Sequence, residues 1–167
     1  MITLYKFPRV WGMPCMSPYC LKVEAYLRLT GLPHRVEVGD LRRAPRGQLP
    51  WIDLDGQVIG DSTLIIDALE RHNVRPLNAG LNPAQLARGW ALTRTLEEST
   101  VWALRHQRFA DSGGWTATRQ VVQSLAPPLL RGVLPTVVRR GMLSALQAQG
   151  AGRYDCAFQR SWTPVSG

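Results

Sequence analysis

The fold of this chain is decided by residues 16–33, which have the sequence MSPYCLKVEAYLRLTGLP. Ser17 supplies a hydroxyl that can cap a helix, and Pro18 stands at the first helical position, where its missing N–H is no loss. Apolar residues then recur at helical spacing until Gly31, a residue type that commonly ends helices. This stretch predicts a helix that begins after Ser17 and ends at about Thr30.

Segments with the character of β-strands lie on both sides of this helix. Residues 2–7 alternate before it, and residues 34–38 form a second strand-like run after it. Farther along, Asp55–Gly56 separates the β-prone residues 49–54 from residues 57–59, which is a strong hairpin signal. These segments predict the order β-α-β, followed by a hairpin.

The rest of the chain is predicted to be mostly helical. A helix opens at Asp61–Ser62 and ends near His72, which completes a compact α/β unit. A linker rich in Asn, Pro and Gly follows, and apolar residues then recur at helical spacing. We predict four parts: an α/β domain at 1–75, a linker at 76–83, a partial all-helical domain at 84–153 and an irregular tail at 154–167.

Two breaks divide the helical part into three expected segments. The segments are 83–109, 115–125 and 129–149, the last of which forms one or two helices interrupted by Pro135. The breaks are Asp111–Gly114 and Pro127–Pro128, since glycine and proline punctuate helices. Trp90, Trp102 and Trp115 are expected to anchor the core of this part, because large aromatic side chains dominate core energetics.

Composition excludes several classes of protein. The 167 residues are 45% hydrophobic and 19% charged, values typical of a globular protein. No apolar run approaches the ~20 residues that span a bilayer, so we expect no integral membrane segment. The net charge of +8 attracts acidic partners weakly. The basic residues are scattered and no nucleic-acid-binding motif accompanies them, so we expect no nucleic-acid partner.

The three cysteines indicate the compartment and one chemical alternative. The chain has an odd number of cysteines, Cys15, Cys20 and Cys156, and is too long for a small disulfide-stabilised scaffold. We therefore expect a reducing, cytoplasmic location. Cys15 and Cys20 lack two further ligands at suitable spacing, so no metal is expected. Cys20 falls on the apolar stripe of the predicted helix, whereas Cys15 precedes its N-terminus, where a thiol can be reactive.

Three motifs of the α/β unit, taken together, resemble the thioredoxin fold as glutathione transferases use it. Ser17–Cys20 resembles a glutaredoxin-type C-P-Y-C with serine in place of the first cysteine. With Lys22 and Val23 it also resembles the S-P-x-x-x-K-V run of serine-type glutathione transferases. Gly47–Pro50 resembles the segment that holds their cis-proline, and Asp61–Ser62 stands where the family usually has Glu-Ser or Gln-Ser.

The longer strings at 16–33 and 42–70 resemble the metaxin and failed-axon-connections branch of this superfamily, including its bacterial members. The resemblance covers roughly residues 1–153. It implies an α/β thioredoxin-like N-terminal domain, a shortened all-α C-terminal domain and a site in the cleft between them. Residues 154–167 resemble nothing in the family, as a truncation or a shifted reading frame would produce.

The resemblance implies that Ser17 holds the sulfur of bound glutathione. A helix N-terminus favours a thiolate over a thiol, and a serine hydroxyl adds one hydrogen-bond donor to the sulfur. Ser17 would therefore attack nothing itself. The glutathione thiolate would attack a small electrophile, with glutathione as co-substrate.

The remaining motifs imply how the peptide part of glutathione is bound. The backbone of Leu49, before Pro50, would pair with the cysteinyl residue in the manner of a strand. The Ser62 hydroxyl and the helix amides would bind the γ-glutamyl carboxylate, and Asp61 would bind the ammonium group. Arg46 or Gln48 would reach the glycyl carboxylate.

Other interpretations stay open at this point. Ser17–Pro18 and Asp61–Ser62 are also complete explanations of two helix starts. Besides a glutathione transferase, we considered a non-catalytic, metaxin-like adaptor and glutaredoxin-like thiol chemistry through Cys15. A homodimer is also considered. The retained Asp61–Ser62 pair favours the enzyme, because an adaptor has no need of it.

Overall fold

The computed structural model describes residues 1–151. The chain divides into two compact units, the first from Met1 to Leu86 and the second beginning at Ala87. The predicted irregular tail at 154–167 lies outside the described residues. Among residues 1–151, none of the helices combines the length and the apolar character that crossing a bilayer requires.

The first unit has the element order that the sequence predicts. Its elements are β1 (Ile2–Lys6), α1 (Pro18–Thr30), β2 (His34–Val38), β3 (Trp51–Leu54), β4 (Gln57–Gly60) and α2 (Ser62–His72). The strands form one sheet in the order β2-β1-β3-β4. β1 pairs in parallel with β2 and antiparallel with β3, and β3 pairs antiparallel with β4. This is the predicted β-α-β followed by β-β-α, the thioredoxin-like arrangement.

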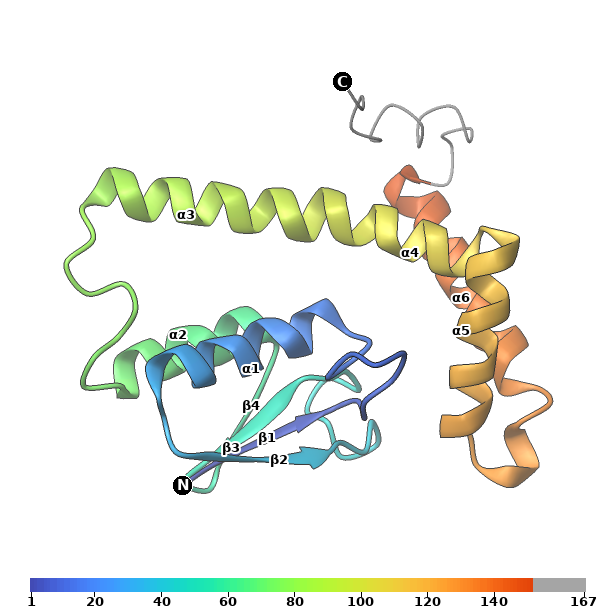
Figure 1. Cartoon of the computed structure of the whole chain (residues 1–167), viewed down its shortest axis with the longest axis horizontal. Helices are drawn as coiled ribbons and strands as arrows, with labels where there is room; N and C mark the ends of the chain where they lie inside the picture. Colours follow the sequence, from blue (N-terminus) through green and yellow to red (C-terminus); the bar gives the residue numbers. More distant parts are fainter. Residues whose placement is uncertain (152–167) are drawn as a thin grey trace. The chain divides into compact units, whose positions relative to one another are not determined.

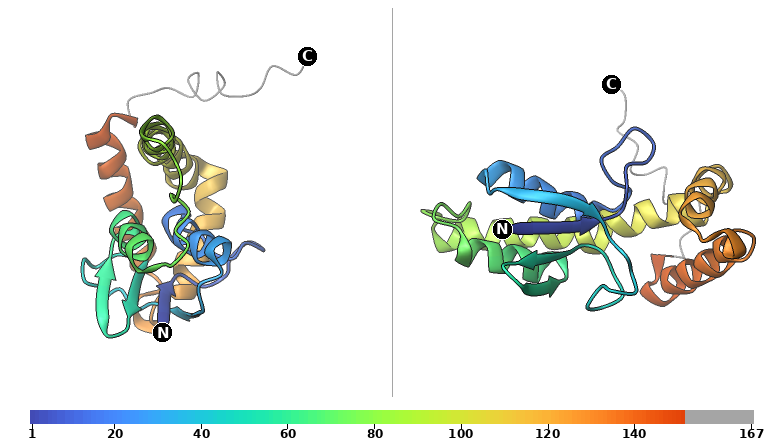
Figure 2. Two further views of the ribbon diagram at one scale, coloured as in Figure 1. Left: turned by 90° about the vertical axis from the view of Figure 1, so that its left-hand side faces the viewer. Right: turned by 90° about the horizontal axis from the view of Figure 1, so that it is seen from below.

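Both helices of the first unit pack on the sheet through one hydrophobic core (Figure 1; Figure 2). The core takes residues from β1, α1, β3 and α2: Ile2, Leu4, Val23, Tyr26, Leu27, Ile52, Leu54, Ile65 and Leu69. Local signals start and end α1 as expected, since Ser17 caps it and Gly31 ends it with a φ of 67°. The core therefore holds the start of α1 and the start of α2 against the same sheet.

The second unit is helical. Its elements, from the segment that leads into it, are α3 (Pro83–Thr95), the π-helical segment η1 (Leu96–Thr100), α4 (Val101–Phe109), α5 (Ser112–Leu125), the 3₁₀ turn η2 (Pro128–Leu130) and α6 (Leu134–Gln149). α4, α5 and α6 pack against one another. Buried residues such as Val101, Val121 and Leu146 lie on these three helices.

Of two predicted interruptions of this unit, one is present but shorter and the other is wrong. The chain leaves the helix after Phe109, but the break covers residues 110–111 and not Asp111–Gly114. α5 begins at Ser112, and Asp111 caps it by accepting a hydrogen bond from the Gly114 N–H at 2.8 Å. A Cβ on Gly114 would lie 1.9 Å from the Gln107 carbonyl oxygen. This glycine therefore permits a close approach of α5 to α4 instead of ending a helix. Pro135 likewise opens α6 rather than interrupting it.

One predicted core anchor is wrong as well. Trp90 is 68% exposed, and α3 has no buried residue. Trp102 and Trp115 are half-buried, and each has an arginine over its ring. The guanidinium of Arg105 lies 4.4 Å from the Trp102 ring centroid, and that of Arg139 lies 4.9 Å from the Trp115 ring centroid.

Candidate functional site

The register of the sheet brings the three sequence motifs to one edge of the first unit, the edge at which β1 and β4 end and β3 begins. Trp51, the first residue of β3, pairs with Tyr5 near the end of β1 and with Gly60 at the end of β4. The loop that leads to Ser17 leaves β1 at this edge. Pro50 enters β3 there, and Asp61 leaves β4 there. Residues far apart in sequence therefore meet because of strand direction alone.

Ser17 is the N-cap of α1 and is half-buried. Its Oγ accepts a hydrogen bond from the Cys20 N–H at 3.4 Å, and its own N–H donates to the Cys15 Sγ at 3.4 Å. The Ser17 hydroxyl also donates to the Cys20 sulfur, since the cap uses only the lone pairs of the oxygen and leaves its hydrogen to donate. The residue therefore has the chemistry of a donor at a helix N-terminus.

The peptide bond between Leu49 and Pro50 is cis. Both residues are buried, and Leu49 packs in one cluster with Cys15, Cys20 and Trp51. This cluster ties the segment before β3 to the loop before α1. The backbone of Leu49 is thereby placed beside the Ser17 turn.

Asp61 and Ser62 start α2. The Asp61 Oδ1 accepts hydrogen bonds from the N–H groups of Thr63 at 2.8 Å and Leu64 at 3.3 Å. Asp61 is exposed and has a φ of 78°, an unusual value for a residue other than glycine, whereas Ser62 is buried. The Nζ of Lys22 on α1 donates to the Thr63 Oγ1 at 3.4 Å. The N-terminal parts of the two helices are therefore in direct contact.

Arg46 and Gln48 are less closely tied to this edge. Both are exposed on the loop that precedes Leu49, on either side of Gly47, whose φ is 63°. The structure assigns neither side chain a contact with the Ser17 turn or with the start of α2. Their role toward a glycyl carboxylate stays a prediction.

The two described cysteines are fully buried, which the sequence indicated for Cys20 but not for Cys15. The pKa of Cys15 lies well below its usual range, because the Cys20 thiol donates to its sulfur and the Ser17 N–H does so as well. The pKa of Cys20 is raised, because Cys15 lies next to it and burial disfavours its charge. Within residues 1–151, no three His, Cys, Asp or Glu side chains are grouped as a metal site requires.

The sequence analysis missed a buried ion pair beneath this edge. The Lys6 Nζ lies 2.7 Å from the Glu24 Oε2 and also donates to the Pro14 carbonyl at 2.7 Å. Burial opposes ionisation of Glu24, but hydrogen bonds from Lys6 and Arg28 outweigh it and keep its pKa below the usual value. Lys6 thus anchors the loop that carries Ser17. Its position at the end of a buried strand was the signal available in the sequence.

The aromatic pair under the loop was also missed. The rings of Tyr5 and Trp51 stack with centroids 3.7 Å apart and planes 9° from parallel. The stacked rings pack β1 against β3 at the edge where the motifs meet.

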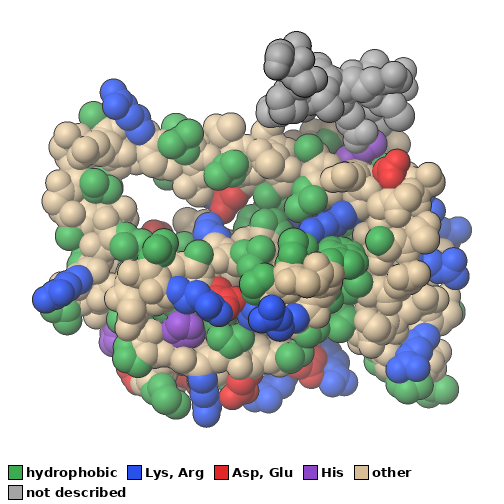
Figure 3. All heavy atoms as spheres, viewed as in Figure 1, with side chains coloured by type: hydrophobic (Ala, Val, Ile, Leu, Met, Phe, Trp, Pro, Cys, Tyr) green, Lys and Arg blue, Asp and Glu red, His purple; other side chains and the backbone are tan. Residues whose placement is uncertain are grey.

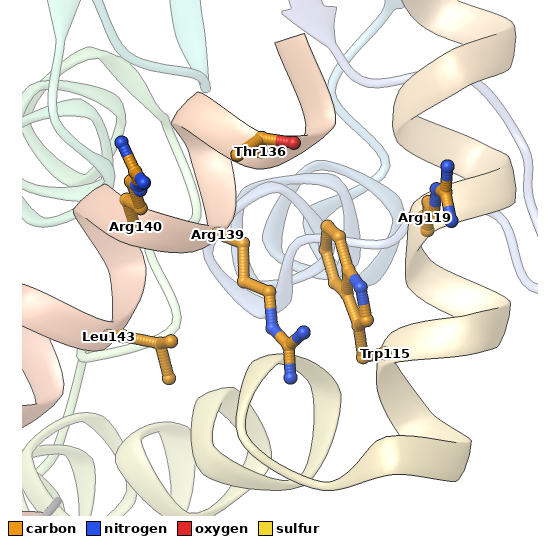
Figure 4. A pocket seen from close by; sticks show the side chains of 6 residues that line it. All are labelled: Trp115, Arg119, Thr136, Arg139, Arg140 and Leu143. Carbon is orange, nitrogen blue, oxygen red and sulfur yellow. The ribbon is translucent and has the colours of Figure 1, made fainter. Parts of the chain in front are cut away.

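A hollow in the second unit does not form a comparable site. It is lined by residues of α5 and α6: Trp115, Arg119, Thr136, Arg139, Arg140 and Leu143. The three guanidinium groups do not converge on one point (Figure 4). Arg139 donates to the Phe109 carbonyl at 3.0 Å and lies over Trp115. It serves the packing of these helices.

Comparisons with known proteins agree with this picture. The family model "Glutathione S-transferase N-terminal domain" matches residues 18–114. The chain is 36% identical to isoprene-epoxide–glutathione S-transferase of Rhodococcus sp. (strain AD45) over 92% of its own length and 67% of that relative. It is 40% identical to Failed axon connections of Drosophila melanogaster over 64% of its length and 26% of that protein.

More distant matches extend the same group. The chain is 29% identical to Metaxin-1 of Bos taurus over 82% of its length and 44% of that protein. The fold matches a glutathione S-transferase from Rhodospirillum rubrum F11 with a TM-score of 0.52 and 23% identity, over 74% of this chain and 62% of that one. The chain thus spans about two thirds or less of these proteins. The family model covers more than half of the chain, and the Rhodococcus transferase is similar to the chain over nearly its whole length. The chain therefore belongs to the glutathione S-transferase family.

Proposed function

We propose that this protein binds glutathione at the edge formed by Ser17, Leu49–Pro50 and Asp61–Ser62, and activates its thiol for attack on a small electrophile. The observation that carries the proposal is the convergence of these three motifs at one edge of one rigid unit. Each motif alone is explained by a helix start or a turn. Their meeting around a half-buried hydroxyl is what a sulfur-binding site needs.

The chemistry assigned to each residue follows from its place. The α1 N-terminus and the Ser17 hydroxyl stabilise the glutathione sulfur as thiolate. The Leu49 backbone aligns the cysteinyl residue, and the start of α2 takes the γ-glutamyl carboxylate. The thiolate then forms a carbon–sulfur bond while the leaving group, or the opened ring oxygen, takes up a proton.

A small epoxide is the electrophile that we propose. The Rhodococcus relative is named for the transfer of glutathione to isoprene epoxide, and it matches 92% of this chain. An epoxide suits a site that supplies a thiolate, because ring strain makes its carbon reactive without a metal. The complete protein's substrate range is part of this proposal, since the chain spans 67% of that relative.

The test compares Ser17→Ala with Ser17→Thr in the full chain. With glutathione and isoprene epoxide, we expect kcat/KM of Ser17→Ala to fall by about 100-fold, as when one donor to a developing charge is removed. Ser17→Thr retains both a hydroxyl and a helix cap and should keep most of the activity. Unchanged kcat/KM in Ser17→Ala, with the thiolate absorbance of bound glutathione also unchanged, would refute the role of Ser17.

A non-catalytic adaptor is the second candidate, favoured by the matches to Failed axon connections and Metaxin-1. A thermal melt with and without millimolar glutathione separates the two. Ligand at 100 times its Kd stabilises a protein by about 2.7 kcal/mol, which raises Tm by several degrees. No shift in a cooperative melt would favour the adaptor.

A further inference from the structure

The side chains of Cys15 and Cys20 lie together in a part of the first unit that solvent does not reach. Cys15 lies in the loop before α1, two residues before the N-cap Ser17, and Cys20 lies in the first turn of that helix. Both side chains are 0% exposed, and they share one cluster with Ala44, Leu49 and Trp51. The stretch 44–51, together with Tyr5 and Phe7, therefore packs around the pair.

The contacts give the two sulfurs different roles. The Cys20 thiol donates a hydrogen bond to the Cys15 sulfur, and the Ser17 N–H donates to the same sulfur at 3.4 Å. The Lys6 ammonium also favours a negative charge on Cys15. A buried cysteine that served only as an apolar filler would have no such donors, and burial alone would favour its neutral thiol. Cys15 is therefore the nucleophile of the pair, and Cys20 holds the proton.

We propose that Cys15 and Cys20 form a redox-active pair that a small hydroperoxide converts to an intramolecular disulfide. The two thiols share one buried cluster and are joined by a hydrogen bond, which keeps their sulfurs close enough to react with each other. Because both side chains are 0% exposed, the reaction requires a local opening of the loop that carries Cys15, and it favours a small oxidant such as hydrogen peroxide. The proposal concerns the sulfur chemistry of this chain and goes beyond glutathione transfer.

The reaction balances in two steps. The Cys15 thiolate attacks one peroxide oxygen, the O–O bond breaks, and the departing hydroxide takes a proton to become water, which leaves a sulfenic acid on Cys15. The Cys20 sulfur then attacks the Cys15 sulfur. The S–O bond breaks, and the departing hydroxide combines with the Cys20 proton as a second water. Two thiols and one hydroperoxide thus yield one disulfide and two waters, and an added thiol reverses the change.

Ser17 links this pair to the candidate site. Its N–H and its Oγ contact Cys15 and the Cys20 N–H, respectively. Oxidation removes the thiolate that accepts from the Ser17 N–H, so the hydroxyl is expected to shift and glutathione to bind more weakly. This consequence rests on the proposed function, whereas the sulfur chemistry does not.

The experiment uses the full chain with Cys156→Ser, so that Cys15 and Cys20 are the remaining thiols. The protein is treated with one equivalent of hydrogen peroxide, unfolded and alkylated, and its intact mass is then measured by mass spectrometry. We expect both thiols to disappear together with the loss of two hydrogen atoms in mass, and dithiothreitol to restore them. Retention of both alkylatable thiols, or disulfide-linked dimers instead, would overturn the proposal.

Two further variants assign the roles of the sulfurs, with circular dichroism as the check of folding. Adding Cys20→Ser should trap a sulfenic acid on Cys15 that reacts with dimedone, and adding Cys15→Ser should leave Cys20 reduced. Equal oxidation of both variants would contradict the assignment. A glutathione-induced rise in Tm that is equal before and after oxidation would remove only the link to Ser17. A rise absent in both states would instead count against the proposed function.

Discussion

At the scale of single residues, the buried pair of Lys6 and Glu24 is the contact on which the candidate site depends most. Both side chains are over nine-tenths buried, and Lys6 also holds the Pro14 carbonyl in the loop that carries Ser17. Arg28 supports Glu24 from the outside at 2.5 Å. A charge buried this deeply is tolerated only while its partner stays in place.

Lys6→Met is therefore expected to destabilise the protein by about 3 kcal/mol, because it leaves the Glu24 carboxylate buried with a single, exposed partner. Urea unfolding measures the loss. Lys22→Met is the matched control, since Lys22 makes an exposed hydrogen bond and should change stability by less than about 0.5 kcal/mol. The double variant Lys6→Met with Glu24→Met should recover much of the loss. Equal effects of the two lysine variants would contradict this account.

Asp61 combines two properties that substitutions can separate. Its Oδ1 caps α2, and under the proposed function its charge would bind the glutathione ammonium. Asp61→Asn keeps a capping oxygen and tolerates a positive φ, so the melting temperature should hardly change while the KM for glutathione rises about tenfold. Asp61→Ala should in addition lose about 1 kcal/mol of stability. An unchanged KM in both variants would leave Asp61 as a cap alone.

At the scale of elements, the junction of α4 and α5 depends on Gly114 but not on its neighbour Gly113. A Cβ on Gly114 would lie 1.9 Å from the Gln107 carbonyl oxygen, whereas a Cβ on Gly113 would meet only the Asp111 Oδ1 at 3.4 Å. Backbone atoms cannot rotate away as a side chain can. The close approach of the two helices therefore depends on the absence of a side chain at position 114.

Gly114→Ala is expected to cost about 1–3 kcal/mol, the usual range for overpacking. Gly113→Ala should be close to neutral or slightly stabilising, because alanine favours a helix over glycine by up to ~1 kcal/mol. Thermal melts of the two variants provide the measurement. A Gly114→Ala protein as stable as the parent would show that α5 can move away from α4.

At the scale of the whole molecule, charge is abundant but not concentrated. The chain carries a net charge of +8, yet Lys and Arg are spread among Asp and Glu over the face shown in Figure 3. Several of the arginines are engaged with carboxylates, such as Arg28 with Glu24 and Arg42 with Asp40. A spread of this kind produces weak, non-specific attraction to polyanions.

Binding to duplex DNA should therefore be weak and dependent on salt. Fluorescence anisotropy with a labelled duplex is expected to detect association at about 0.05 M salt and none at about 0.2 M. A duplex of unrelated sequence serves as the control and should behave in the same way. Sequence-selective binding that survives the higher salt would contradict the expectation that nucleic acid is not a partner.

Elements whose signals are local could be predicted from the amino-acid sequence. Ser17–Pro18 and Gly31 bound α1, Asp55–Gly56 makes the hairpin, and Asp61 caps α2, because caps and turns depend on a few neighbouring residues. The order of elements in the first unit followed from these signals, whereas the family was indicated by the resemblance of the Ser17, Pro50 and Asp61 motifs.

The tertiary structure alone decided what depends on distant contacts. The lack of a side chain at Gly114 matters because the Gln107 carbonyl lies against it, Trp90 is exposed, and Cys15 is buried by residues more than thirty positions away, such as Leu49. Lys6, at the end of β1, forms an ion pair with Glu24 on α1, the helix that follows. Local patterns report backbone preference, whereas burial and ion pairing are set by which surfaces the fold brings together.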